Sequence, residues 1–362
     1  MSKRIGILTS GGDCAGLNAV IRAVVTRAID TYGWEVLGII QGTRGMMERP
    51  VAYRRLYSSD FTGQIMRMGG TILGTTNKGD PFAYPMPDGT RKDRADEVTA
   101  GYRELGLDAI VVIGGDGSME ILRHLAQRGG WNMVAIPKTI DNDVGLTEVS
   151  VGYATAVDVA TEALDRLQPT AASHDRVMVL ELMGRDAGHI ALSAGIAGGA
   201  DVIIIPELPY SLEGIADHIR EIRRKGRNFA LVVCAESART GGGDKLTTTK
   251  SQGEVRYGGV GQYLGAQIAE MTGAETRVTV LGHVQRGGQP SASDRLMASA
   301  FGVRAVDLIA AGKFDRMVAW QNRCVVDVPI TDAIASYQAV DPNGDLLKTA
   351  RGLGIYVGVE DS

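Results

Sequence analysis

Short apolar runs rich in β-branched residues alternate along this chain with stretches that carry apolar residues at helical spacing. Neighbouring parallel strands need a long crossover connection, usually a helix, and parallel sheets are buried on both faces. The alternation therefore predicts an α/β protein whose mainly parallel sheets are covered by helices on both faces. The predicted strands are Ile5–Leu8, Val36–Ile40, Ala109–Ile113, Val134–Ile136, Val177–Leu180, Val202–Ile205, Leu231–Val233 and Val278–Leu281.

The length of 362 residues exceeds the ~100–200 residues of an ordinary domain, so two lobes are expected. Two polar, glycine-rich stretches, 77–96 and 240–259, are expected to be exposed loops. The tail 330–362 is expected to cover the smaller lobe.

Charge and cysteine content exclude several classes of protein. The net charge is −4 at pH 7, so the chain has no overall basic field for holding nucleic acid. The three cysteines are sparse and lack metal-site spacing, which favours a reducing, cytoplasmic compartment and argues against zinc. No run of 18 apolar residues is present, so no membrane partner is expected.

The first glycine-rich turn follows the predicted strand Ile5–Leu8. It contains Gly11 and Gly12 and leads into a helical pattern over 18–28. A strand, a glycine turn and a helix N-terminus bring backbone N–H groups to an anion, so the turn is a candidate phosphate site. Neither the P-loop nor the GxGxxG pattern is present, and a plain tight turn remains the alternative.

A second turn of the same design follows Ala109–Ile113. It reads Gly114-Gly115-Asp116-Gly117-Ser118, with an acid where ligands of open α/β sheets bind. Asp116 suits Mg²⁺, which takes one or two carboxylates together with phosphate oxygens. The string also occurs in NAD kinases and lipid kinases, so it indicates nucleotide phosphate without naming the acceptor.

An acidic loop follows the strand Val134–Ile136 and carries Asp141 and Asp143. Residues two apart in an extended segment face the same way, so both carboxylates are expected to face one cleft. One would accept the proton of an attacking hydroxyl and the other would support a metal. An ordinary Asx-rich turn is the alternative.

Taken together, the motifs resemble those of the phosphofructokinase family, which phosphorylates fructose 6-phosphate at its 1-hydroxyl. The resemblance runs from about residue 3 to about residue 325. It rests on five motifs in the family order: 9–18, 114–118, 137–143, 183–185 and 281–288.

The resemblance implies a role for each matching residue. Asp141 would be the general base, with Asp143 beside it near the metal, and Asp116 would bind Mg²⁺ as the cofactor. Thr139 and Arg185 would complete the catalytic set. Donor contacts would come from Gly11, Gly12, Gly115, Asp116, Gly117, Ser118 and Lys138. Sugar contacts would come from Thr139, Ile140, Asp141, Met183, Gly184, Arg185 and Glu236, and the 6-phosphate would be held by Arg176, Arg277, His283 and Arg286.

The resemblance also implies lobes and partners. Residues 1–152 plus 285–335 would form the donor-binding lobe, and 153–284 plus 336–362 the sugar-phosphate-binding lobe, with the ligands joined in the cleft between them. Family members place Arg176 and Arg277 across a subunit interface, which implies a homo-oligomer, usually a tetramer. No role is predicted for His124, His174, His189 or His218.

Two positions bear on the phosphoryl donor. Gly117 favours ATP, because pyrophosphate enzymes usually carry an aspartate there that crowds and repels the nucleotide. Lys138 points toward pyrophosphate, whose users usually have lysine there. The expected donor is ATP, since an extra ammonium can serve either one. Many members have arginine where Asn77 stands, so Asn77 and Lys78 are carried over as donor contacts on weaker grounds.

Two further alternatives stay open. A non-catalytic sensor of nucleotide and sugar phosphate would retain the same binding loops, but the carboxylates at 116, 141 and 143 argue against it. A kinase for another acceptor, such as an NAD kinase, would have no use for the anion-binding motif at 281–288.

Overall fold

The computed structural model describes residues 2–240, 243, 245–249 and 255–359. The chain divides into two compact units. Unit 1 comprises 1–140, 144–155 and 286–337, and unit 2 comprises 141–143, 156–285 and 338–362. The acidic loop 141–143 thus groups with unit 2, although the residues on either side of it belong to unit 1.

Unit 1 is built on an eight-stranded, mostly parallel sheet, which confirms the predicted fold class for this part of the chain. Its core strands are apolar and fully buried, as expected when helices cover both faces. The strand order is β16 (Cys324–Pro329), β15 (Arg316–Gln321), β7 (Met133–Thr139), β6 (Ala109–Gly114), β1 (Arg4–Thr9), β2 (Glu35–Ile39) and β3 (Tyr53–Leu56), with β8 (Val151–Gly152) paired to β7.

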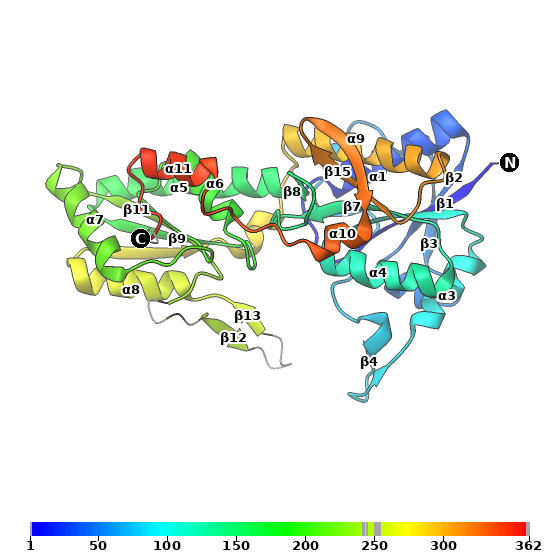
Figure 1. Ribbon diagram of the computed structural model, residues 1–362, viewed down its shortest axis with the longest axis horizontal. Helices are drawn as coiled ribbons and strands as arrows, with labels where there is room; N and C mark the ends of the chain where they lie inside the picture. Colours follow the sequence, from blue (N-terminus) through cyan, green and yellow to red (C-terminus); the bar gives the residue numbers. More distant parts are fainter. Residues whose placement is uncertain (1, 241–242, 244, 250–254, 360–362) are drawn as a thin grey trace. The chain divides into compact units, whose positions relative to one another are not determined.

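Helices lie on both faces of this sheet (Figure 1). One face shares a core with α2 (Thr43–Met47), α3 (Ala95–Glu104), α4 (Asp116–Gly129) and α10 (Ile330–Ala335). The other carries α1 (Leu17–Thr26), continued by a π-helical stretch Arg27–Thr31, and α9 (Ala292–Ala310). Gly302 allows α9 to approach α1 closely, because a Cβ there would lie 2.6 Å from that of Ala23.

The edge strands of the unit 1 sheet, β16 and β3, each pair antiparallel to their neighbour. Neither edge strand was predicted from the sequence. At one edge β15 and β16 form a hairpin. Its two turn residues, Asn322 and Arg323, have φ of 49° and 65°, as a type I′ turn requires. The other edge strand, β3, is largely exposed and polar, so it lacks the apolar run that marks the inner strands.

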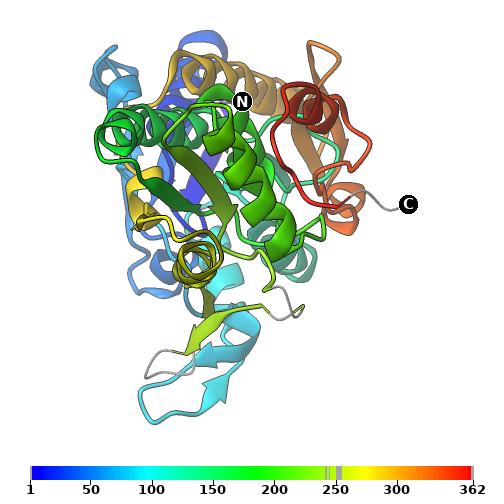
Figure 2. The ribbon, with the colours of Figure 1, turned by 90° about the vertical axis from the view of Figure 1, so that its left-hand side faces the viewer.

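Unit 2 contains a four-stranded parallel sheet in the order β10 (Val202–Ile204), β11 (Ala230–Ala235), β9 (Val177–Leu182) and β14 (Thr276–Val280). One face packs on α7 (Leu212–Arg224) and α8 (Val260–Thr272). The other faces α5 (Tyr153–Ser173) and α6 (His189–Ala197) (Figures 1 and 2). Unit 2 is therefore the three-layer sandwich that the alternation predicts.

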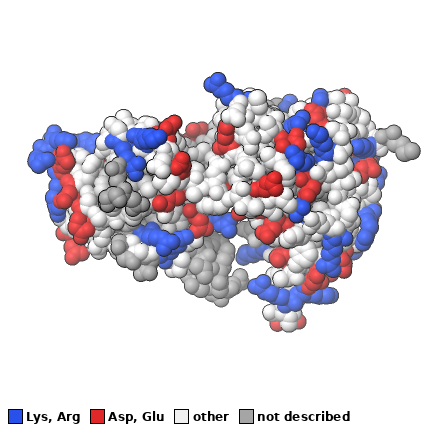
Figure 3. Space-filling model, viewed as in Figure 1, with Lys and Arg blue, Asp and Glu red and all other residues white. Residues whose placement is uncertain are grey.

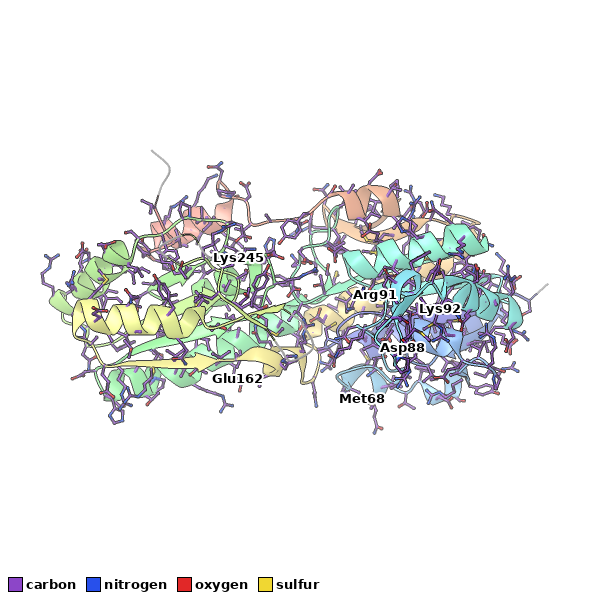
Figure 4. All side chains as sticks on the ribbon, turned by 90° about the horizontal axis from the view of Figure 1, so that it is seen from below. Met68, Asp88, Arg91, Lys92, Glu162 and Lys245 are labelled. Carbon is purple, nitrogen blue, oxygen red and sulfur yellow. The ribbon has the colours of Figure 1, made fainter. Side chains whose placement is uncertain are left out.

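The two stretches expected to be exposed loops contain short hairpins. In unit 1, β4 (Tyr84–Pro85) pairs with β5 (Arg91–Lys92), and the labelled Asp88, Arg91 and Lys92 lie on this hairpin in Figure 4. In unit 2, β12 (Thr247–Thr249) pairs with β13 (Val255–Tyr257), and part of the predicted loop falls outside the described residues. Short 3-10 turns occupy Ser58–Asp60, Ile65–Arg67, Pro81–Ala83 and Gly282–Arg286.

The tail carries α11 (Asp345–Gly352), which packs against α6 within unit 2. None of the described helices is long and apolar enough to cross a bilayer. On the face seen in Figure 3, acidic and basic side chains are interspersed over each unit.

Candidate active site

The first glycine turn is held by backbone and hydroxyl contacts from two neighbouring segments of unit 1. The Ser10 N–H donates to the Ile113 carbonyl at 2.9 Å, and the Gly11 N–H donates to the Thr76 carbonyl at 2.9 Å. The Thr75 hydroxyl donates to the Gly11 carbonyl at 2.7 Å. Gly11 has a φ of +83°, which only glycine adopts without strain, so its identity is required by the turn.

Two cationic side chains point at this turn. The Nζ atom of Lys138, whose side chain is buried, donates to the Gly12 carbonyl at 2.5 Å. Nη1 of Arg286 donates to the Asp13 carbonyl at 3.2 Å, and a Cβ on Gly12 would lie 2.9 Å from the same atom. Glycine at 12 thus leaves room for a guanidinium and an ammonium on one turn, an arrangement suited to phosphate oxygens.

Buried polar contacts hold the residues that pack against the first glycine turn. The Cys14 thiol donates to the Val151 carbonyl at 3.3 Å, and burial raises its pKa to about 12. The buried Asp294 carboxylate accepts from the N–H groups of Gly152 and Thr155, both at 2.8 Å. These contacts tie the first turn of α9 to the start of α5, directly beneath the glycine turn. Asp294 lies outside the recognised motifs, so its role could not be predicted from the sequence.

The second glycine turn lies beside the first. Gly115 is the N-cap of α4, and a Cβ on Gly11 would lie 3.0 Å from the Ser118 hydroxyl oxygen. At Gly117 a Cβ would meet no atom of the described residues within 4 Å. The structure therefore leaves open space beside Gly117, where an aspartate would crowd a nucleotide.

Asp116 is the first residue of α4 and is half-buried. Within the described part of the chain, no three histidine, cysteine, aspartate or glutamate side chains cluster as a metal site would require. A Mg²⁺ ion that keeps waters and takes most of its other ligands from phosphate needs only one or two carboxylates. Asp116 at the end of β6 fits that modest requirement.

Asn77 and Lys78 are both exposed. They follow Thr76, whose carbonyl contacts Gly11 and whose hydroxyl donates to the Lys78 carbonyl at 3.0 Å. The backbone of this segment therefore supports the first glycine turn, and the side chains of Asn77 and Lys78 are exposed beside it.

The acidic loop follows Thr139, the last residue of β7. Ile140 is 1% exposed, which leaves its backbone rather than its side chain for a ligand. Asp141 and Asp143 are 7% and 4% exposed. Asn142 between them has a φ of +57°, so the premise of an extended segment with both carboxylates on one side is wrong. Among residues other than glycine, asparagine adopts this conformation most readily, which suits the residue found here.

The candidate sugar loop lies at the carboxyl end of β9 in unit 2. The Met183 N–H donates to Oε1 of Gln285 at 2.7 Å, and the Arg185 N–H donates to Oε1 of Glu236 at 3.1 Å. Gly184 has a φ of +155° and would place a Cβ 2.5 Å from the Ala187 carbonyl oxygen. The loop therefore brings together the predicted residues Met183, Gly184, Arg185 and Glu236.

Glu236 is electrostatically unusual. Burial raises its pKa from 4.5 to about 7, and the nearby carboxylates of Asp141 and Glu181 add to the rise. The N–H donors of Gly184 and Arg185 act in the opposite direction. Glu236 and Asp141 thus belong to one acidic group in unit 2, in which the neighbouring carboxylates disfavour ionisation of Glu236.

Arg176 and Arg277 lie at the other end of the same sheet. Arg176 precedes β9, and Arg277 pairs with Met178 near its start. Both guanidinium groups bind the Glu275 carboxylate, Arg176 at 2.9 Å. Because a strand rises ~3.3 Å per residue, about 23 Å separates Arg176 from Met183 along the strand. Within one chain, these arginines do not reach the ligand that Arg185 and Glu236 would hold.

The other two predicted 6-phosphate ligands fall in different units. His283 is exposed and follows β14 in unit 2, at the same end of the sheet as Met183. Arg286 groups with unit 1, where it contacts the Gly12 turn. Gln285 between them was not predicted as a site residue; it is 1% exposed, and its Oε1 accepts from the Met183 N–H. Its place inside the 281–288 motif was the available signal.

Comparison with known proteins gives one family. Residues 4–309 match the family model described as Phosphofructokinase. A protein named ATP-dependent 6-phosphofructokinase 1 from Synechocystis is 63% identical over 356 residues, which is 98% of both chains. A protein of the same name from Nostoc is 62% identical over 357 residues, which is 99% of both chains.

A solved structure is also similar. The phosphofructokinase of Pichia pastoris in the T-state matches with a TM-score of 0.80 and 29% identity. The match covers 98% of this chain but 36% of the Pichia chain, so this chain spans about a third of that protein's length.

Proposed function

The chain belongs to the phosphofructokinase family, and we propose that it transfers the terminal phosphoryl group of ATP to the 1-hydroxyl of fructose 6-phosphate. The product is fructose 1,6-bisphosphate, a glycolytic intermediate. The observation that carries this conclusion is an identity of more than 60% over nearly the whole chain to relatives named ATP-dependent 6-phosphofructokinase.

The names of these relatives favour ATP over pyrophosphate, and the open space at Gly117 agrees with that choice. An aspartate there would set a carboxylate against the nucleotide phosphates. Lys138 keeps pyrophosphate as the second candidate donor, because its ammonium is held at the glycine turn where either donor would place phosphate oxygens.

On the donor side, the role of the protein is positioning and charge neutralisation, which phosphoryl transfer mainly needs. The backbone of Gly11, Gly12 and Gly115 would accept the phosphates without a side chain in the way. Lys138 would neutralise charge on the leaving phosphate, and Ser118, Asn77 and Lys78 would add contacts around it. Magnesium would be held by Asp116 together with phosphate oxygens and would draw negative charge from the transferring group.

On the acceptor side, Asp141 would accept the proton of the 1-hydroxyl. Asp141 is 7% exposed and lies near Glu236, so little water competes with the sugar hydroxyl for its carboxylate. Asp143 and Thr139 would support that step. Met183, Gly184, Arg185, Glu236 and the backbone of Ile140 would orient the sugar, and His283 and Arg286 would bind its 6-phosphate.

The position of Arg176 and Arg277 supports a homo-oligomer, with a tetramer as the expected state. Both lie at the amino end of β9, away from the sugar loop of their own chain. A second copy could present them to its neighbour's site, which would give each sugar phosphate two further guanidinium groups. The sparse cysteines, each with a free thiol, support a cytoplasmic location.

The test is a coupled assay for fructose 1,6-bisphosphate with purified protein, Mg²⁺ and fructose 6-phosphate, given ATP or pyrophosphate in parallel. A high rate with ATP and a low rate with pyrophosphate is expected. The reverse ratio would overturn the donor. No product with either donor would instead favour a non-catalytic sensor.

A further inference from the structure

We propose that the segment 336–340 is a positioning element for the catalytic acid loop, and that His189 holds this segment in place. The proposal rests on the proposed function, in which Asp141 and Asp143 act on the sugar hydroxyl. It assigns a role to His189, for which the sequence predicted none, and to part of the tail, which was expected only to cover the smaller lobe.

The segment runs antiparallel to the end of the acid loop. The Gln338 N–H donates to the Asp143 carbonyl at 3.0 Å, and Val144 forms an isolated antiparallel bridge with Tyr337. A Cβ on Gly145 would lie 2.3 Å from the Ser336 carbonyl oxygen. The glycine therefore permits a close approach of two backbones that are almost 200 residues apart in sequence.

His189 makes the second tie. Its Nε2 atom lies 2.9 Å from the Gln338 carbonyl oxygen. A carbonyl can only accept, so Nε2 carries the proton and donates. Gln338 thus uses both of its backbone polar groups, with the N–H bound to the acid loop and the C=O bound to the first residue of α6.

Glu207 makes the third tie. Its Oε1 accepts from the Val340 N–H at 3.0 Å and from the Gly188 N–H at 2.9 Å. The same carboxylate oxygen therefore joins the tail to the residue that precedes His189. Three segments of unit 2, at the start of α6, after β10 and in the tail, converge on the stretch that contacts Asp143.

This convergence matters because the acid loop has an irregular backbone, with Asn142 in the left-handed region. Neither ladder hydrogen bonds nor a helix fixes such a loop from within. A shift of 1 Å in a catalytic group can lower the rate about 100-fold. A support from outside the loop would therefore act mainly on the rate of the chemical step, because most of the proposed sugar contacts, at 183–185, 236, 283 and 286, lie outside the loop.

The experiment compares His189→Leu, which removes the donor, with His189→Gln, whose side-chain N–H can still reach the carbonyl. Leu346→Ala in α11 is the matched tail control, because Leu346 is exposed. For each variant we would measure kcat, KM for fructose 6-phosphate, Tm, and hydrogen exchange at the Gln338 amide. We expect His189→Leu to lower kcat about tenfold with KM and Tm unchanged. Its Gln338 amide should exchange faster, and both effects should be absent in His189→Gln and Leu346→Ala.

Two outcomes would overturn the proposal. One is a wild-type kcat and wild-type exchange in His189→Leu. The other is a parallel loss of Tm and kcat in both histidine variants, which indicates a structural role only. Failure of the proposed function is distinguishable, because the wild-type protein itself would then form no product, while the exchange measurement would still report whether His189 holds the segment.

Discussion

The Nζ atom of Lys138 donates to the Gly12 carbonyl oxygen at 2.5 Å, although the two residues are 126 positions apart in sequence. This contact fixes a buried ammonium against the backbone that is proposed to receive the donor phosphates. A charge held in place before the substrate binds needs no reorganisation during the reaction, which is the condition for effective electrostatic catalysis.

Replacing Lys138 by methionine keeps most of the length of the side chain, which is one heavy atom shorter, and removes its charge. Because one preorganised donor is worth roughly 100-fold to 1,000-fold in rate, kcat with ATP is expected to fall by about that factor. Steady-state kinetics at saturating fructose 6-phosphate measure the effect, with Lys225→Met on the exposed end of α7 as the control. Unchanged kcat would show that the ammonium has only a structural role.

Gly117→Asp tests the donor pocket. No described atom lies near a Cβ at this position, and an acid in the first turn of a helix interacts favourably with the helix dipole. Thermal stability is therefore expected to stay the same or rise. Binding of ATP should weaken at least about tenfold, which corresponds to ~1.4 kcal/mol of repulsion. Gly117→Ala, without the charge, should keep most of its affinity. Equal KM values for ATP in the two variants would contradict the argument.

Glu236 gives a pH dependence of known sign. Its pKa is raised from 4.5 to about 7 in the folded protein, so between these values the native state binds the proton and the unfolded state does not. Stability should therefore fall as the pH rises from 4.5 to about 7 and level off above that range. Denaturant unfolding of wild type and Glu236→Gln across this window measures the effect. As the pH rises, the free energy of unfolding of Glu236→Gln should increase relative to that of wild type. If the difference between the two free energies does not change with pH, the pKa of Glu236 is close to its ordinary value.

Complementation tests the shared site. An Arg176→Ala, Arg277→Ala double variant and an Asp141→Asn variant should each have low activity alone. If a site combines the acid loop of one subunit with the arginines of its neighbour, hybrid oligomers contain some sites that are intact. Unfolding and refolding the two variants together should then give more activity than the sum of the two alone. If the activity of the refolded mixture only equals the sum of the two variants alone, the acid loop and the arginines act within one subunit.

Much of the fold was predictable because parallel strands buried on both faces appear as apolar runs. Every predicted run corresponds to a strand, from β1 to β14. The edge strands were missed for physical reasons. Tyr53, Arg54 and Arg55 of β3 are exposed and carry no apolar signal, and the turn between β15 and β16 uses Asn322 and Arg323 where glycine is the usual marker.

The site divides in the same way. Glycine-rich turns and carboxylates are residue types that indicate phosphate and metal chemistry, so the glycine turns, Asp116 and the acid loop could be named as candidates from the sequence. Supports that depend on distant contacts were not, because nothing local distinguishes His189 from a surface histidine or Asp294 from an ordinary acid. Their roles arise from partners 149 and about 140 positions away.

The buried sulfur of Cys14 gives the donor turn a built-in chemical reporter. Thiolates react and thiols do not, and this sulfur, with a pKa of about 12, is shielded from reagents and almost wholly protonated at neutral pH. The exposed Cys324 has no such shield. The speed at which an alkylating agent modifies Cys14, relative to Cys324, therefore measures how often the turn opens. If a nucleotide binds at this turn as proposed, the alkylation of Cys14 should be slower in its presence.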